Sequence, residues 1–241
     1  MIDILGALFA AAIYVAQVGT LVGFAPARVP AKLGALAIAS VWGATVVAVG
    51  AVGGFTLRLA GLVPLPVLAF ALALAALFGA WIFLPGFRNA LLAVPLPALV
   101  GLNIARLGGV FFLLLAARDR LSYSFASPAG VGDMIVATLA IPVAIAAVRG
   151  AVRGAARVGW IRAWNALGAL DLAVAIATGA LSAQGTPYRV FSEGPGTAAM
   201  TQLPWVLVPA IIVPVYILMH FTIAVKLRAP ERVPRAVAVA G

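Results

Sequence analysis

The sequence predicts an all-α, polytopic integral membrane protein, a bundle of seven transmembrane helices in a single domain. Hydrophobic residues make up 65% of the chain and charged residues only 9%, whereas soluble domains carry about 25% charged residues. Apolar runs of the length that crosses a bilayer recur from end to end and leave no stretch for a soluble domain. These runs are too long and too continuous for barrel strands. We expect spans at residues 2–25, 32–55, 62–84, 97–117, 128–148, 160–182 and 203–225.

The limits of the first three spans follow from their flanking residues. The first run is longer than the apolar core of a signal peptide and has Asp3 in place of a basic leading segment, so we expect a retained span. The second begins at Lys32. The third opens with Pro64 and Pro66, which a first helical turn tolerates, and ends at Pro85, where a Pro-Gly pair marks a turn.

The later spans carry clearer start and bend signals. The fifth is expected to begin with Ser127 as its cap and Pro128 at the first helical position. The connection 183–202, rich in Gly, Pro, Ser and Thr, is the longest of the chain. The seventh span contains Pro209 and Pro214, which remove backbone donors and predict a bend.

The basic residues predict the topology. With seven spans, one set of connections holds eleven Lys and Arg residues and the other holds four. The positive-inside rule therefore places the N-terminus outside and the C-terminus in the cytoplasm. The richer set contains Arg28, Lys32, Arg88, Arg149, Arg153, Arg157, Arg162, Lys226, Arg228, Arg232 and Arg235. We expect these basic cytoplasmic surfaces to attract anionic lipid headgroups. Within them, the segment 149–157 is predicted to form a short basic helix on the membrane surface.

Ionisable residues inside the predicted spans are the candidate site. A charge at the bilayer centre costs about 2.5 to 3.5 kcal/mol, and Arg106 and Asp171 both fall at mid-span, which makes them the favoured ion pair. By the helical rise, Asp133 lies about 9 Å nearer the outside and His220 about 8 Å nearer the cytoplasm, giving a ladder across the membrane. The candidate intramembrane polar network comprises Arg106, Asp171, Asp133, His220, Asn103 and Asn165.

A structural role for these residues is the competing interpretation. An Arg106–Asp171 pair between two helices would fix the packing of the bundle without any ligand, since intramembrane polar contacts contribute about 1 kcal/mol each. Asp133, near the start of its predicted helix, would be favoured by hydration or by the helix dipole. His220 would be an interfacial residue that is simply hydrogen-bonded.

Several kinds of chemistry have no support in the sequence. One histidine and no cysteine predict no metal site and no cofactor, although His220 alone would suffice as a single axial ligand of haem. The two lysines, Lys32 and Lys226, lie at helix ends, which disfavours a retinal Schiff base in the membrane. No catalytic pair is recognisable, so an enzyme is the least favoured class. The net charge of +10 is explained by topology, and we expect no nucleic-acid partner.

Four segments carry a resemblance. Residues 106–112 (RLGGVFF), 128–133 (PAGVGD) and 164–172 (WNALGALDL), together with His220, are similar to a group of uncharacterised bacterial multi-span membrane proteins. The resemblance covers about the C-terminal two thirds of the chain. It implies a multi-pass protein of the bacterial cytoplasmic membrane and no known activity.

Two functions remain in competition. Intramembrane ionisable residues commonly mark substrate or ion pathways, which favours a small-molecule or proton-linked transporter, although no inverted repeat is evident. The alternative is a non-enzymatic sensor, assembly factor or ligand-binding subunit in which the buried charges are structural. A dry contact between Arg106 and Asp171 would favour the structural role, and an occupied cavity beside them would favour transport or ligand binding. The sequence does not distinguish these two arrangements.

Overall fold

A computed structural model describes residues 1–148 and 155–228, and among these are seven helical segments long and apolar enough to cross a membrane, as predicted. Five are single helices: α1 (Ile2–Gly23), α2 (Val29–Ala51), α3 (Leu65–Phe83), α7 (Tyr123–Val148) and α8 (Ala155–Leu181). The basic residues Arg149 and Arg153 of the predicted surface helix, and the tail after Arg228, lie outside the described residues.

The other two spans are interrupted helices. The fourth consists of α5 (Leu96–Leu102), the 3₁₀ segment η2 (Asn103–Gly109) and α6 (Val110–Ala116). The seventh consists of the π-helical segment η5 (Val208–Ile212) followed by α9 (Val213–Arg228). Irregular backbone of these kinds within a helix often marks a functional site.

Proline explains part of the irregularity in the seventh span. Pro214 has no N–H to donate to the carbonyl of Ala210, four residues earlier. The indole Nε1 of Trp42, on α2, donates to that carbonyl at 3.1 Å. A side chain from a neighbouring helix therefore satisfies the group that the proline leaves without a partner.

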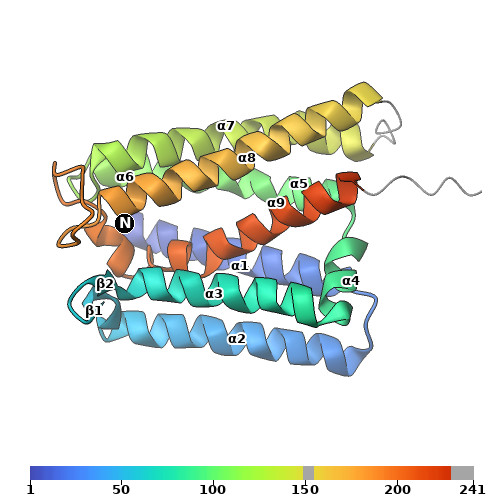
Figure 1. The fold of residues 1–241 in the computed structure, drawn as a ribbon, viewed down its shortest axis with the longest axis horizontal. Helices are drawn as coiled ribbons and strands as arrows, with labels where there is room; N and C mark the ends of the chain where they lie inside the picture. Colours follow the sequence, from blue (N-terminus) through green and yellow to red (C-terminus); the bar gives the residue numbers. More distant parts are fainter. Residues whose placement is uncertain (149–154, 229–241) are drawn as a thin grey trace, which may run out of the picture.

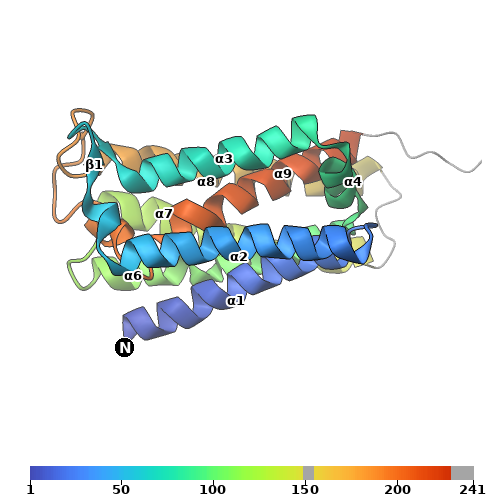
Figure 2. The same cartoon turned by 90° about the horizontal axis from the view of Figure 1, so that it is seen from below.

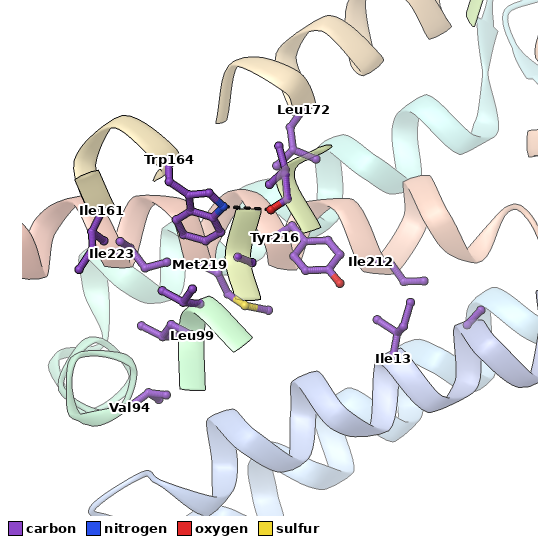
Figure 3. Close-up of a cluster of buried hydrophobic side chains, with 14 residues drawn as sticks. Ile13, Val94, Leu99, Ile161, Trp164, Leu172, Ile212, Tyr216, Met219 and Ile223 are labelled. Atoms are coloured by element: carbon purple, nitrogen blue, oxygen red, sulfur yellow. Dashed lines mark hydrogen bonds between the residues drawn. The ribbon is translucent and has the colours of Figure 1, made fainter. Parts of the chain in front are cut away.

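The seventh span lies at the centre of the bundle. Figures 1 and 2 show α9 crossing between the paired helices α7 and α8 and the group formed by α1, α2 and α3. It packs against both α8 and α3, and η5 packs against α1 and α3. Around α9 lies the largest apolar cluster, which includes Leu99, Trp164, Met219 and Ile223 (Figure 3). Of the described Arg, Lys, Asp, Glu and His residues, Arg106, Asp171 and His220 are buried, and they lie where α9 packs against its neighbours.

The connections contain structure that the sequence pattern did not predict. A nine-residue helix, α4 (Pro85–Ala93), follows α3 where a short linker was expected. A hairpin of two short antiparallel strands, β1 (Arg58–Leu59) and β2 (Val63–Pro64), joins α2 to α3. The long connection contains the 3₁₀ turn η4 (Ala198–Thr201) and lies, with the hairpin, at the end of the bundle that carries the N-terminus (Figure 1).

The start of the fifth span was predicted wrongly. Helix α7 begins at Tyr123 rather than at residue 128, and Pro128 lies inside it. The long connection stabilises this earlier start, because the Glu193 carboxylate accepts a hydrogen bond from the backbone N–H of Ser124 at 3.2 Å. A carboxylate at a helix N-terminus satisfies a free N–H and is favoured by the helix dipole. The local Ser-Pro signal could not reveal a cap that comes from 69 residues away.

Candidate ligand-binding site

Arg106 is the centre of the candidate site. It lies on η2, and its side chain is only 1% exposed. Its Nε donates to Asp133 Oδ1 on α7 at 2.6 Å, and its Nη2 donates to Asp171 Oδ2 on α8. One guanidinium therefore bridges two carboxylates from two helices, with Asp171 as the partner that the matched depth favoured.

His220 completes the polar contacts of the guanidinium. Arg106 Nη1 lies 3.1 Å from His220 Nε2 and 3.3 Å from the carbonyl oxygen of Gly168. A guanidinium only donates, so Nε2 must accept and the ring proton must be on Nδ1. That nitrogen lies 2.9 Å from Asn165 Oδ1, and Asn165 Nδ2 donates to the backbone carbonyl of His220 at 3.1 Å. The hydrogen-bond pattern thus fits a neutral histidine held in one tautomer by Asn165.

The predicted ladder is a single cluster. Asp133 and His220 were expected on different levels from Arg106, but both lie within hydrogen-bond distance of it. The rise along a helix measures backbone positions, whereas an arginine side chain is long and has five donors in a fork that reaches several partners. The earlier start of α7 also places Asp133 deeper in its helix than the sequence suggested.

Asn103 is buried near the cluster but does not join it. Its Nδ2 donates to the carbonyl of Leu99 in its own helix at 2.9 Å, and its Oδ1 has no hydrogen-bond partner among the described residues. The other five residues of the predicted network are linked by hydrogen bonds. Asn103 and Arg106 lie three residues apart on η2, but the short Asn103 amide bonds within its own span instead of joining the cluster.

Glycines allow the helices to come close enough for these contacts. A Cβ atom built on Gly132 would overlap Asp171 Oδ1, and one on Gly168 would lie 2.7 Å from His220 Nε2. The backbones of Gly109 and Gly130 also approach closely, with a Cβ on Gly130 placed 2.7 Å from the Gly109 carbonyl oxygen. Small residues at such contacts permit tight helix packing in membranes. The cluster therefore depends on glycine as much as on charge.

Aromatic residues surround the cluster. The Tyr216 ring centroid lies 5.7 Å from the guanidinium carbon of Arg106, a cation–π arrangement. Its hydroxyl donates to the carbonyl of Leu102 at 3.2 Å. Trp164 donates from Nε1 to the carbonyl of Val136 at 3.0 Å (Figure 3), which fixes the ring beside His220. Sequence reasoning missed Tyr216, whose position three residues after Val213 and four before His220 would have placed it on the face of His220.

The cluster lies at the inner end of a cavity of about 420 Å³. The cavity extends from residues near the N-terminal end of the bundle, including Arg58 and Gln184, to Arg106, Asp133 and Tyr216. Its walls are largely apolar and aromatic, from α1, α3, α6, α7, α8 and η5 together with the connections. Such a space, apolar with a few polar groups at one end, is typical of small-molecule sites.

The two carboxylates differ in their access to the cavity. The Asp133 side chain is 20% exposed and lines the cavity, whereas the Asp171 side chain is 8% exposed and is held behind Arg106 and Gly132. With both acids ionised and His220 neutral, the cluster carries one excess negative charge. Among the described residues, no group of three or more His, Asp or Glu side chains is arranged to hold a metal ion.

Comparison with known proteins gives a family without a described activity. No curated protein and no solved structure matches the chain. A family model described as "Domain of unknown function (DUF8737)" matches residues 63–228. The matched region runs from β2 to the end of α9 and contains Arg106, Asp133, Asp171 and His220. Because it covers more than half of the chain, the protein belongs to the DUF8737 family.

Proposed function

We propose that this membrane protein is a proton-linked transporter of a small molecule that binds in the cavity beside Arg106 and Asp133. The observation that carries the proposal is the junction of a largely apolar cavity with a buried, hydrogen-bonded cluster of ionisable residues. Ionisable residues inside membrane spans commonly mark substrate or ion pathways because burying them is costly.

The broken helices support the same proposal. Both interrupted spans contribute to the site, Arg106 from η2 and the wall residues Pro209 and Ile212 from η5. Transporters commonly place substrate sites at discontinuous helices near the bilayer midplane. At such a point the helix already departs from the regular α-helical hydrogen-bond pattern, which suits a protein that must alternate between states.

The charge balance supports a link to protons. One guanidinium and two carboxylates leave one negative charge without a partner in a water-poor environment, where an unpaired charge is costly. Binding one proton or one monovalent cation neutralises the cluster. The apolar packing beyond Arg106, around Leu99, Trp164 and Met219, separates this site from the other end of the bundle. The cavity formed by the described residues therefore reaches the cluster from one end of the bundle only. Alternating access requires a substrate site that is open to one side of the membrane at a time.

A ligand-binding subunit or sensor is the second candidate. It is favoured by the directness of the Arg106 contacts, since the guanidinium reaches both carboxylates and His220 without an intervening gap. A cluster that only fixes the packing of α7, α8 and α9 would leave the cavity as a binding site whose occupancy alters a contact with another protein. In that case a ligand binds but does not cross the membrane.

Transport is tested in liposomes containing the purified protein and an imposed pH gradient. Uptake is measured for radiolabelled cationic, anionic and neutral organic solutes, with and without a protonophore. We expect accumulation of at least one solute that requires the gradient and is lost in Asp171→Asn and Arg106→Gln. Uptake that these substitutions leave unchanged, or no gradient-dependent uptake by folded protein, contradicts the proposal. Asp119→Asn, in the exposed turn before α7, is the matched control.

The membrane orientation forms part of the proposal. We place the end of α9 that carries Lys226 and Arg228 in the cytoplasm of a bacterial cell, beside anionic lipid headgroups, each basic residue contributing about 1 kcal/mol near the surface. A reporter enzyme fused to the C-terminus is expected to be active only on the cytoplasmic side. Activity on the outside would reverse the topology.

A further inference from the structure

We infer that the cavity binds an apolar, monovalent organic cation, whose charged group pairs with the Asp133 carboxylate at the inner end. The inference rests on the proposed function, because it names the substrate class of the same cavity. Three features of the described residues lead to it: which charge is accessible, which oxygen is free, and what the walls are made of.

Accessibility determines the sign of the ligand's charge. Both Arg106 and Asp133 border the cavity, but the Arg106 side chain is 1% exposed and the Asp133 side chain is 20% exposed. The guanidinium is already bound to two carboxylates and a histidine. An anion would have to displace a carboxylate to reach it. A cation meets a carboxylate that is within reach.

Asp133 also has an oxygen available. Its Oδ1 accepts from Arg106 Nε at 2.6 Å, and among the described residues no protein group donates to its Oδ2. An ionised carboxylate has about four lone-pair sites, so the second oxygen can accept from an ammonium group or lie against a quaternary one. With the Asp171 charge behind it, a monovalent cation brings the cluster to neutrality.

The walls determine the rest of the ligand. Aromatic rings line the cavity along its length, among them Phe9, Phe55, Phe70, Phe111, Phe112 and Trp205. Aromatic faces attract organic cations, and the interaction is stronger where water is excluded. Burial of hydrocarbon surface in the cavity adds to the affinity. Both terms favour a cation with a bulky hydrocarbon body over a small hydrated ion.

The positive charge of Arg58, at the outer end of the cavity, is already bound by backbone carbonyls. Arg58, on β1, donates through its guanidinium to the carbonyls of Gln184 and Gly185. It lies at the exposed end, where water and salt screen its charge over about 8 to 10 Å. Its contacts join the α2–α3 hairpin to the connection after α8, at the end through which a ligand would enter.

A proton and the cation compete for the same charge. The ionisable groups around Asp133 are Arg106 on η2, Asp171 on α8 and Tyr216 on α9, and His220 on α9 contacts the Arg106 guanidinium. Only one excess negative charge is shared by this set. Binding of one cation to a singly protonated cluster therefore releases one proton. The net charge of the cluster stays the same, and binding of the cation is coupled to release of the proton.

The test compares two ions of nearly the same shape and opposite charge. Binding of radiolabelled tetraphenylphosphonium to the purified full-length protein in detergent is measured with tetraphenylborate as competitor. We expect saturable binding of the cation, no displacement by low concentrations of the anion, and weaker binding as the pH falls. In Asp133→Asn the affinity is expected to fall at least about 30-fold, since losing one partner of a buried charge pair costs 2 kcal/mol or more. Asp119→Asn should bind as the wild type does.

Each outcome decides the inference. Preferential binding of the anion, binding of the cation that Asp133→Asn leaves unchanged, or no saturable binding of the cation by folded protein overturns it. If Asp133→Asn does not fold, proton release by the wild type replaces it, measured in weak buffer at a pH low enough to weaken cation binding. About one proton per bound cation is expected there, and none contradicts the inference. A cation that binds at Asp133 but is not moved across liposomes refutes transport alone and leaves the binding site in place.

Discussion

Replacing Arg106 by a residue that keeps the hydrocarbon part of its side chain but not the guanidinium should destabilise the protein severely. In Arg106→Met the hydrocarbon part of the side chain is retained, but Asp133 and Asp171 face each other without their shared cation. Removing one partner of a buried pair costs about 3 to 5 kcal/mol because a buried charge is left uncompensated. With the Arg106 side chain 1% exposed and Asp171 8% exposed, solvent offers little relief, and two carboxylates rather than one are affected.

A second ion pair of the same chain provides the control. Arg120 Nη1 lies 2.8 Å from Asp3 Oδ1, but these side chains are 31% and 46% exposed. Exposed pairs contribute about 0 to 1 kcal/mol, so Arg120→Met should cost little. The triple variant Arg106→Met, Asp133→Asn, Asp171→Asn removes all three charges and should recover most of the loss, since a buried ionic set can be replaced by neutral groups of similar volume at small cost.

The assay is reversible unfolding in mixed micelles as the fraction of sodium dodecyl sulfate is raised, followed by circular dichroism. The expected order of stability is wild type, then Arg120→Met, then the triple variant, then Arg106→Met. If Arg106→Met costs no more than Arg120→Met, the cluster is hydrated rather than buried, and the reasoning from uncompensated charge is refuted. If the triple variant is as unstable as the single one, the loss comes from packing.

Three further predictions concern the surroundings of the site. Gly132→Ala should cost about 1 to 3 kcal/mol in the same unfolding assay, because its methyl group overlaps the Asp171 carboxylate, and Gly132→Ser should be at least as harmful. Hydrogen bonding from Ser124 lowers the pKa of Glu193 below its ordinary value of 4.5. The ionised Glu193 carboxylate therefore stabilises the fold above pH 4.5, and this stabilisation is lost as the pH falls through the lowered pKa. Unfolding curves of the wild type and Glu193→Gln should differ at neutral pH and coincide in acid. Trp42→Phe should cost about 1 kcal/mol by removing the hydrogen bond to the carbonyl that the proline of α9 leaves free, and equal unfolding curves would show that this carbonyl finds another partner.

Hydropathy predicted the fold, because the length of an apolar run is set by the bilayer and needs no knowledge of contacts. Seven helical segments long and apolar enough to cross a membrane are present among the described residues. Three of them start five residues from the predicted position, α7 and α8 earlier and the seventh segment later. For α7 the reason is an N-terminal cap from Glu193, far along the chain. The short surface helix α4 was missed because its sequence is neither long nor uniformly apolar. Such elements are defined by what they pack against.

The candidate site was predictable in composition but not in geometry. The cost of burying charge identified Arg106, Asp133, Asp171 and His220, and the structure brings these four together. Their arrangement around one guanidinium could not be foreseen, because depth along each helix does not show how far the Arg106 side chain reaches to the neighbouring helices. The cavity could not be predicted from the sequence either, since its walls come from both halves of the chain.

Different spans supply the charged and the apolar residues of the cavity, which matters for redesigning its ligand specificity. Its ionic chemistry comes from the later spans, whereas α1 contributes only apolar surface, including Phe9, Ala10 and Ile13. The Phe9 ring lies against Gly108, two residues from the arginine, where there is no side chain to exclude it. The dimensions of the cavity can therefore be redesigned from the first helix while the electrostatics stay constant. Shape and charge are separately adjustable in this bundle.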